Sequence, residues 1–185
     1  MKKVYSIFLF SLLLFYFTAN TACSQNNDLK LVFIRHAEKP DDGDNLNCQG
    51  LNRSLQLPAV LMKKFGKPNN IYIPSPKTGQ VTKRARMLQT ITPFVAKYNL
   101  NINSQYDVED FKKISKALLN ESGTILIVWE HNNIKPIVKS LGVKGSSLNW
   151  PDSDFDSIWV VTFKSGEAIL TKDKEGLKPS ASCSF

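Results

Sequence analysis

Short apolar runs alternate along the chain with longer segments in which apolar residues recur every three to four positions. Such spacing separates buried strands from amphipathic helices. The runs that predict strands are Leu29–Arg35, Asn70–Ser75, the weaker Asn101–Gln105, Thr124–Glu130, Ile158–Phe163 and Glu167–Thr171. The segments that predict helices are Leu51–Phe65, Gln80–Tyr98, Val108–Leu119 and Asn133–Leu141.

The order of these elements predicts the fold class. Strands and helices alternate, which favours a mostly parallel central sheet with helices on both faces, a three-layer α/β/α domain. The last two strands have no helix between them and are joined through Lys164-Ser165-Gly166. They therefore predict a C-terminal antiparallel hairpin at the sheet edge. We expect one domain over residues 29–175, followed by a loosely ordered tail over 176–185 that lacks any periodicity.

The beginning of the chain does not follow this pattern. Lys2 and Lys3 precede the apolar stretch Val4–Phe17, and small or polar residues follow up to Ala22. This is the layout of a secretory signal, so we expect a signal peptide over residues 1–22.

The residue after this leader is Cys23, in the position of the cysteine that bacterial lipoproteins carry on their mature N-terminus. Asn20 stands where such proteins usually have a large aliphatic residue, which leaves cleavage without lipid, or an uncleaved anchor, as alternatives. We expect lipidation of Cys23, a short tether over residues 23–28 and an extracytoplasmic domain on a bacterial envelope membrane. All three alternatives place the domain outside the cytoplasm.

Two further cysteines, Cys48 and Cys183, remain for the domain itself. An oxidising compartment permits a disulfide, but the sequence leaves open whether these two residues pair or stay separate thiols. The chain has two histidines and no CxxC spacing, so we expect no metal site.

The chain carries a net charge of +8, which falls to +6 without the two lysines of the leader. Such an excess can steer anionic substrates toward a cleft. Basic residues do not form a dense run with interleaved aromatics, so we do not expect nucleic acid as a partner.

Both histidines stand where a predicted core strand stops. Arg35-His36 ends the first run, and His131 follows the run that ends at Glu130. Open α/β sheets bind ligands beyond the carboxyl ends of their strands, so we expect the two imidazoles to share one crevice. An arginine beside one of them points to phosphate chemistry.

Three blocks of the sequence are Leu31-Val32-Phe33-Ile34-Arg35-His36-Ala37-Glu38, then Ser75 with Arg86-Met87-Leu88-Gln89-Thr90, and Val128-Trp129-Glu130-His131. In this order, over roughly residues 29 to 141, they resemble the histidine phosphatase superfamily, which includes the cofactor-dependent phosphoglycerate mutases. Ala37 replaces the more usual glycine of the first block, as in the phosphohistidine phosphatase branch.

The resemblance implies a role for each matching residue. His36 would attack phosphorus through one ring nitrogen while a backbone carbonyl holds the other, and His131 would donate a hydrogen bond to the phosphoryl oxygens. Arg35 and Arg86 would clamp the phosphate, because a planar guanidinium binds it in a bidentate manner. Lys39 and Lys83 are further candidates for binding substrate, with a solvated surface position as the alternative for each. Family members often have pocket-rim residues at the positions of Asn45 and Arg53.

The acid that protonates the leaving oxygen has no clear match. Asn132 stands where acid-phosphatase-like members have an aspartate, and it cannot supply a proton comparably. A phosphoramidate or an activated phosphate would need less protonation than an alkyl ester. The carboxyl groups that remain as candidates are those of Glu38, Asp107, Glu109 and Glu130.

The expected function is that of a phosphohydrolase that needs neither metal nor cofactor. It would remove a phosphoryl group from a small phosphate ester or phosphoramidate through a phosphohistidine on His36. Mutase activity is not expected, because the chain is shorter than those enzymes and its donor block is unrecognisable. The alternatives are a catalytically silent envelope protein that binds a phosphorylated ligand and an interaction module at the envelope surface. The natural substrate and the oligomeric state stay open.

Overall fold

The computed structural model describes residues 28–77, 84–145 and 148–183, which form a six-stranded sheet in the order β3-β2-β4-β1-β5-β6. The strands are β1 (Lys30–Arg35), β2 (Asn70–Tyr72), β3 (Ile102–Asn103), β4 (Thr124–Trp129), β5 (Ser157–Lys164) and β6 (Glu167–Lys174). The helices are α1 (Cys48–Phe65), α2 (Ala85–Tyr98), α3 (Phe111–Leu118) and α4 (His131–Ser140).

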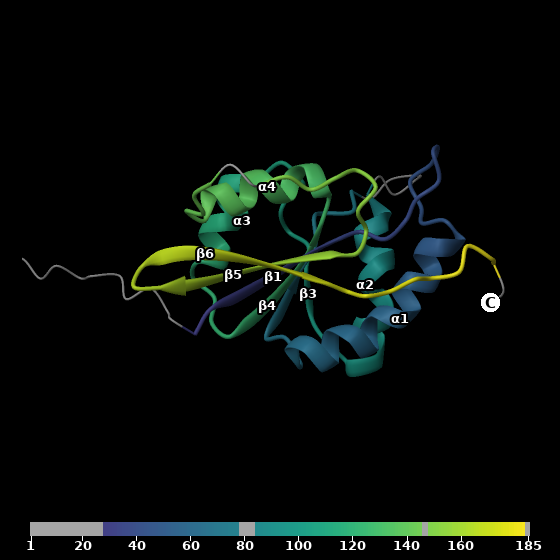
Figure 1. Ribbon diagram of the computed structural model, residues 1–185, viewed down its shortest axis with the longest axis horizontal. Helices are drawn as coiled ribbons and strands as arrows, with labels where there is room; N and C mark the ends of the chain where they lie inside the picture. Colours follow the sequence, from purple (N-terminus) through teal and green to yellow (C-terminus); the bar gives the residue numbers. More distant parts are fainter. Residues whose placement is uncertain (1–27, 78–83, 146–147, 184–185) are drawn as a thin grey trace, which may run out of the picture.

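Strands β1 to β4 run parallel, whereas β5 is antiparallel to β1 and β6 is antiparallel to β5. This confirms the predicted α/β class and the hairpin at the sheet edge. Helices α3 and α4 cover one face of the sheet, and α1 and α2 cover the other (Figure 1).

The alternation of side chains along β1 explains the two layers of core. Leu31 and Phe33 pack in one hydrophobic cluster together with Ile134 of α4. Val32 and Ile34 pack in the other cluster, against residues of α1 and α2. Successive side chains of a strand point to opposite faces, so an unbroken apolar run is buried on both sides.

Several elements begin or end away from the predicted boundaries. Helix α1 begins at Cys48, before the first periodic apolar residue, because the Asn47 side chain accepts a hydrogen bond from Gly50 N and caps the helix. Helix α4 begins at His131, directly after β4, with Glu130 as its N-cap residue. Strand β6 extends to Lys174, which pairs with Ser157 at the start of β5.

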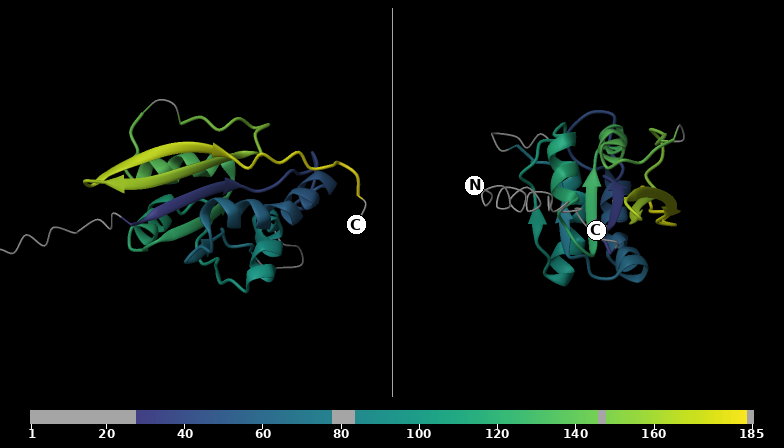
Figure 2. Two further views of the ribbon diagram at one scale, coloured as in Figure 1. Left: turned by 60° about the horizontal axis from the view of Figure 1, so that its bottom comes forward. Right: turned by 90° about the vertical axis from the view of Figure 1, so that its left-hand side faces the viewer.

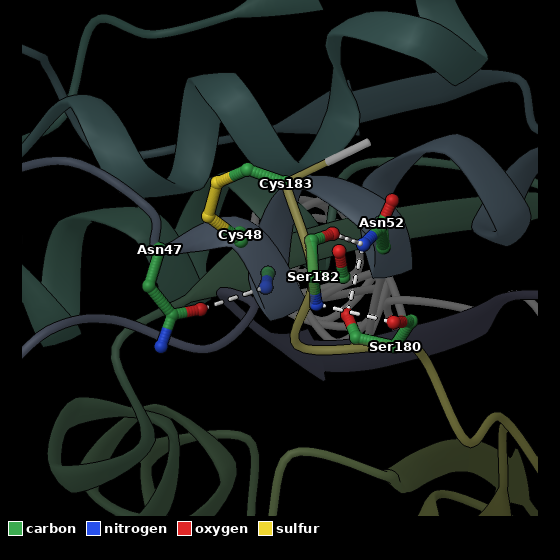
Figure 3. The surroundings of a disulfide bond; sticks show 7 residues. Asn47, Cys48, Asn52, Ser180, Ser182 and Cys183 are labelled. Carbon is green, nitrogen blue, oxygen red and sulfur yellow. Dashed lines mark hydrogen bonds between the residues drawn. A yellow bond between two sulfur atoms is a disulfide. The ribbon is translucent and has the colours of Figure 1, made fainter. Parts of the chain in front are cut away.

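The segment that follows β6 has no helix or strand, and its contacts tie it to α1 (Figures 1 and 2). The Asn52 amide donates hydrogen bonds to the carbonyls of Ser180 (2.8 Å) and Ser182 (2.9 Å). A disulfide joins Cys183 to Cys48 at the start of α1 (Figure 3). The tail that we expected to be loosely ordered is therefore held along α1 up to Cys183, and the open question of cysteine pairing is answered.

Disulfides form and persist in oxidising environments, so the Cys48–Cys183 bond is consistent with an extracytoplasmic domain. The predicted signal peptide and Cys23 lie outside the described residues. None of the described helices is long and apolar enough to cross a membrane.

Candidate active site

Neighbouring parallel strands bring the two histidines together. Arg35 ends β1 opposite Trp129 of β4, and His36 N donates to the Trp129 carbonyl at 3.1 Å. His131 comes two residues after Trp129, and its charge acts on the ring of His36. Because β1 and β4 are parallel neighbours, this pairing places both histidines at the carboxyl ends of the two strands, where we expected them to meet.

The ring of His36 is held in one orientation and is 2% exposed. Its Nδ1 lies 2.7 Å from the carbonyl oxygen of Ala37, which leaves Nε2 for other partners. Burial lowers the pKa of His36 to about 3, and the charges of Arg35, Arg86 and His131 act in the same direction. The ring is therefore neutral near pH 7, as a nucleophile requires.

The second block contacts the loop that carries His36. Thr90 Oγ1 of α2 accepts a hydrogen bond from Ala37 N at 2.9 Å and donates one to the carbonyl of Arg86 at 2.7 Å. Gln89 binds Leu46 N (3.0 Å) and the Asn45 side chain (2.6 Å). Arg86 thus lies one helical turn from the residue that touches the His36 loop, and its charge lowers the pKa of His36.

Arg35 is engaged by the segment Pro151–Phe155, which precedes β5 and which we call the covering segment. The guanidinium Nη1 donates to the carbonyls of Asp152 (2.5 Å) and Asp154 (3.3 Å), and its carbon lies 3.8 Å from the centre of the Phe155 ring. Burial lowers the pKa of Arg35 to about 10, against the opposing charges of Asp152 and Asp154. The side chain therefore stays cationic at neutral pH.

His131 meets the same segment. Its Nε2 lies 2.6 Å from Asp152 Oδ1, and this carboxylate opposes the effect of burial, which lowers the pKa of His131. Sequence reasoning missed both Asp152 and Phe155, because nothing in the local pattern of residues 151–155 distinguishes them from an ordinary loop. Only the fold brings this loop over the end of β1.

Three nitrogen atoms of the predicted site are buried without a hydrogen-bond partner among the described residues: Arg35 Nε, Arg86 Nε and His131 Nδ1. Buried polar groups are nearly always paired in folded proteins, and unpaired ones often mark functional positions. All three belong to the residues that the resemblance assigns to phosphate binding.

Two of the candidate proton donors are bound to cations. Glu38 accepts hydrogen bonds from Arg53 Nε (2.9 Å) and Nη2 (2.8 Å). Asp107 forms ion pairs with Lys77 (2.7 Å) and Arg84. The hydrogen bond from Lys77, aided by Arg84, lowers the pKa of Asp107 to about 2, so this carboxyl is ionised at neutral pH.

The other two candidates differ in their link to the site. Glu109 is exposed before α3. Glu130 is half-buried, and its charge opposes the lowering of the pKa values of Arg35 and His131 that burial causes. Glu130 is thus the candidate among the four whose charge acts on both of these site residues.

Arg53 does not lie at a pocket rim. Its side chain is 5% exposed, and besides Glu38 it binds Glu175 (2.5 Å) and, more weakly, Asp156 (3.5 Å). Instead of lining a pocket rim, Arg53 is the centre of a buried cluster of charged side chains, one of which, Glu38, follows His36 by two residues. Arginine suits this position because its fork can bind more than one carboxylate.

The remaining predicted binding residues, Lys39 and Lys83, are not brought into contact with the histidines in the part of the chain that the structure describes. Lys39 is exposed and donates to the carbonyl of Pro40 at 3.3 Å. Lys83 lies outside the described residues. No group of three or more histidine, cysteine, aspartate or glutamate side chains within residues 28–77, 84–145 and 148–183 has the geometry to hold a metal ion.

No protein-family model matches the chain, and no curated protein matches its sequence. Solved structures do match. The protein histidine phosphatase SixA, complexed with tungstate, is 20% identical over 79% of this chain and 97% of its own, with a TM-score of 0.56. A phosphoserine phosphatase from Entamoeba histolytica, complexed with phosphoserine, is 16% identical over 80% of this chain and 96% of its own, with a TM-score of 0.53.

A structure from Agrobacterium tumefaciens that is named as a phosphohistidine phosphatase SixA is 16% identical over 82% of this chain and 99% of its own, with a TM-score of 0.53. At such low identity the likeness establishes the fold alone. The chain is thus structurally similar to members of the histidine phosphatase superfamily over almost their full length.

Proposed function

We propose that the protein is a phosphohydrolase that forms a phosphohistidine on His36. The observation that carries this proposal is the arrangement at the end of β1. A neutral, buried imidazole is held through Nδ1, beside a cationic guanidinium and next to a second histidine. Nucleophile, phosphate clamp and transition-state donor are the three parts that a metal-independent phosphoryl transfer needs.

The proposed reaction has two steps. His36 Nε2 attacks phosphorus, a new N–P bond forms, and the bond from phosphorus to the leaving oxygen or nitrogen breaks. Water then attacks the phosphohistidine, which releases inorganic phosphate and restores the neutral ring. Phosphate monoester hydrolysis is among the slowest uncatalysed reactions, so positioning and charge neutralisation must supply most of the acceleration.

The cations of the site would supply that neutralisation. Arg35 and Arg86 would bind the phosphoryl oxygens, and His131 would donate to them as charge develops. The buried, unpartnered Nε atoms of Arg35 and Arg86 support this role, because phosphoryl oxygens would provide the acceptors that the described residues do not.

The state of the candidate proton donors bears on the substrate class. Glu38 and Asp107 are held as ion pairs, and Asn132 cannot supply a proton comparably. An alkoxide leaves poorly without protonation, whereas the leaving group of an activated phosphate does not need it to the same degree. We therefore propose a phosphoramidate or another activated phosphate in preference to an alkyl ester, with Glu130 as the remaining candidate donor.

The location that we propose is extracytoplasmic, with a lipid anchor on Cys23 after removal of residues 1–22. The Cys48–Cys183 disulfide supports an oxidising compartment. The anchor itself rests on the sequence of the leader.

Turnover of an aryl phosphate in the presence of a chelator tests the proposed reaction. The unmodified protein should release the phenol and, when quenched without acid, carry a phosphoryl group on His36. His36→Asn should lower turnover by at least about a thousandfold, since loss of a nucleophile removes the covalent route. Circular dichroism and a thermal melt would check that the variant is folded.

A phosphate-binding protein without catalysis is the second candidate. It is favoured by the same pairing of Glu38 with Arg53 and of Asp107 with Lys77, which leaves the site without an assigned acid. Binding of inorganic phosphate with neither turnover nor a phosphoenzyme would support this alternative and contradict the proposed hydrolysis.

A further inference from the structure

The covering segment, Pro151–Phe155, lies over the residues that are proposed to bind phosphate. The chain returns from the far end of α4 to the end of the sheet at which β1 stops (Figure 1). Phe155 lies against Arg35, with its ring centre 6.0 Å from that of His36. The nucleophile below this segment is 2% exposed.

The contacts of the covering segment are of the kind that a phosphoryl group would make. Carbonyl oxygens of Asp152 and Asp154 accept hydrogen bonds from Arg35. The Asp152 carboxylate lies 2.6 Å from His131 Nε2. Two of the proposed phosphate-binding residues therefore have oxygen atoms of one short segment as partners.

The two ends of the covering segment differ in how firmly they are held. The Asp154 carboxylate accepts hydrogen bonds from Ser157 N (2.9 Å), Ser157 Oγ (2.6 Å) and Lys174 Nζ (3.0 Å). The Asp152 side chain, in contrast, is 91% exposed, and among the described residues its hydrogen-bond partner is His131. Asp152 can thus leave its position without breaking the contacts that hold Asp154.

From this geometry we propose that Asp152 sets the anion affinity of the site, because its carboxylate competes with the phosphoryl group for His131. The inference rests on the proposed function, since it takes His131 as a phosphate-binding residue. A ligand that must displace an internal competitor binds more weakly than its intrinsic affinity. Its apparent affinity is the intrinsic affinity multiplied by the fraction of protein in which the competitor is not bound. A phosphoryl group with several charged oxygens can win this competition by reaching Arg35 and Arg86 as well.

The charge states of the pair agree with competition. The His131 contact lowers the pKa of Asp152, so the side chain is an anion at neutral pH, like the group with which it competes. Arg35, Glu130 and Asp152 are the charged groups that act on His131. An ionised Asp152 cannot serve directly as a general acid.

Calorimetric titration with inorganic phosphate at pH 7.5 tests this proposal on the full-length protein and its Asp152→Asn variant. The variant keeps the size of the side chain and the backbone contacts with Arg35. We expect phosphate to bind about three- to tenfold more tightly to the variant, a modest gain because the competing carboxylate is mostly solvated. Glu167→Gln is the matched control. It removes the same charge from an exposed position at the opposite end of the sheet and should leave the affinity unchanged.

The other outcomes overturn the proposal in different ways. Equal or weaker phosphate binding by Asp152→Asn would mean that Asp152 orients His131 rather than competes for it, while the proposed function would stand. Absence of phosphate binding in all three proteins would overturn the proposed phosphate site itself.

Discussion

At the scale of single residues, the environment of His36 differs strongly from that of a free imidazole. Burial removes the water that would stabilise an imidazolium, and three neighbouring cationic or ionisable side chains oppose a further positive charge. The contact between Nδ1 and the Ala37 carbonyl favours the tautomer that carries its proton on Nδ1. The same local structure thus determines both the charge and the orientation of the proposed nucleophile.

We expect the His36 ring to stay neutral from pH 8 down to pH 5, because its pKa in the folded protein is about 3. Nitrogen-15 NMR of the imidazole measures this directly. The unfolded chain binds a proton on this ring below about pH 6.5, so the stability contributed by the neutral ring is present above that pH. It is lost as the pH falls toward 3. A titration midpoint near 6.5 for His36 in the folded protein would contradict this account.

At the scale of elements, α1 approaches the loop after β1 so closely that the position of contact, Gly50, has no room for a side chain. A Cβ atom placed on Gly50 would lie 2.2 Å from the carbonyl oxygen of Glu38, which is a backbone atom and cannot rotate away. The Asn47 N–H also donates to this carbonyl at 3.1 Å. Glycine in the first turn of α1 therefore permits the contact that sets the path of the chain after His36.

Gly50→Ala should destabilise the protein by about 1–3 kcal/mol, because overpacking against fixed backbone forces the helix and the loop apart. Alanine would otherwise favour a helix over glycine by about 1 kcal/mol, so the expected sign is opposite to that of helix propensity. Urea unfolding measures the difference. Gln56→Ala, at an exposed position of the same helix, should change stability by less than about 0.5 kcal/mol. Equal or higher stability of Gly50→Ala would show that the close approach is not maintained.

At the scale of the whole molecule, a buried charge cluster joins segments from across the chain. Arg53 of α1 is the single cation, and its partners are Glu38 after β1, Asp156 before β5 and Glu175 after β6. One guanidinium cannot neutralise three carboxylates, and Glu175 is the most deeply buried of them. Burial raises the pKa of Glu175 to about 8 in spite of the opposing effect of Arg53.

The stability that Glu175 contributes should therefore depend on pH. Its folded pKa is above the ordinary value of 4.5, so the contribution is fully present below pH 4.5 and is lost as the pH rises through about 8. Glu175→Gln removes this titration. We expect the free energy of unfolding of the unmodified protein to fall relative to the variant between pH 5 and pH 8, by on the order of 2 kcal/mol. A constant difference across this range in urea unfolding would show that Glu175 is ionised in the folded protein.

The elements and the core of the site could be predicted from the sequence because each depends on local information. The apolar runs ending at Arg35 and at Glu130 predict buried strands, and parallel strands end at one edge of a sheet. That is sufficient to expect His36 and His131 near each other. Boundaries were less certain where a polar cap decides them, as Asn47 does for α1.

The α/β class, the order of the elements and the histidines and arginines of the proposed site could all be predicted from the residues along the chain. The surroundings of these side chains emerged only from the packing of the folded protein: Asp152 on His131, Phe155 on Arg35, the pairing of Glu38 with Arg53, and the disulfide that ties the C-terminal segment to α1. The physical reason is range. Periodicity and caps act within a few residues, whereas these contacts join positions whose approach depends on how whole elements pack.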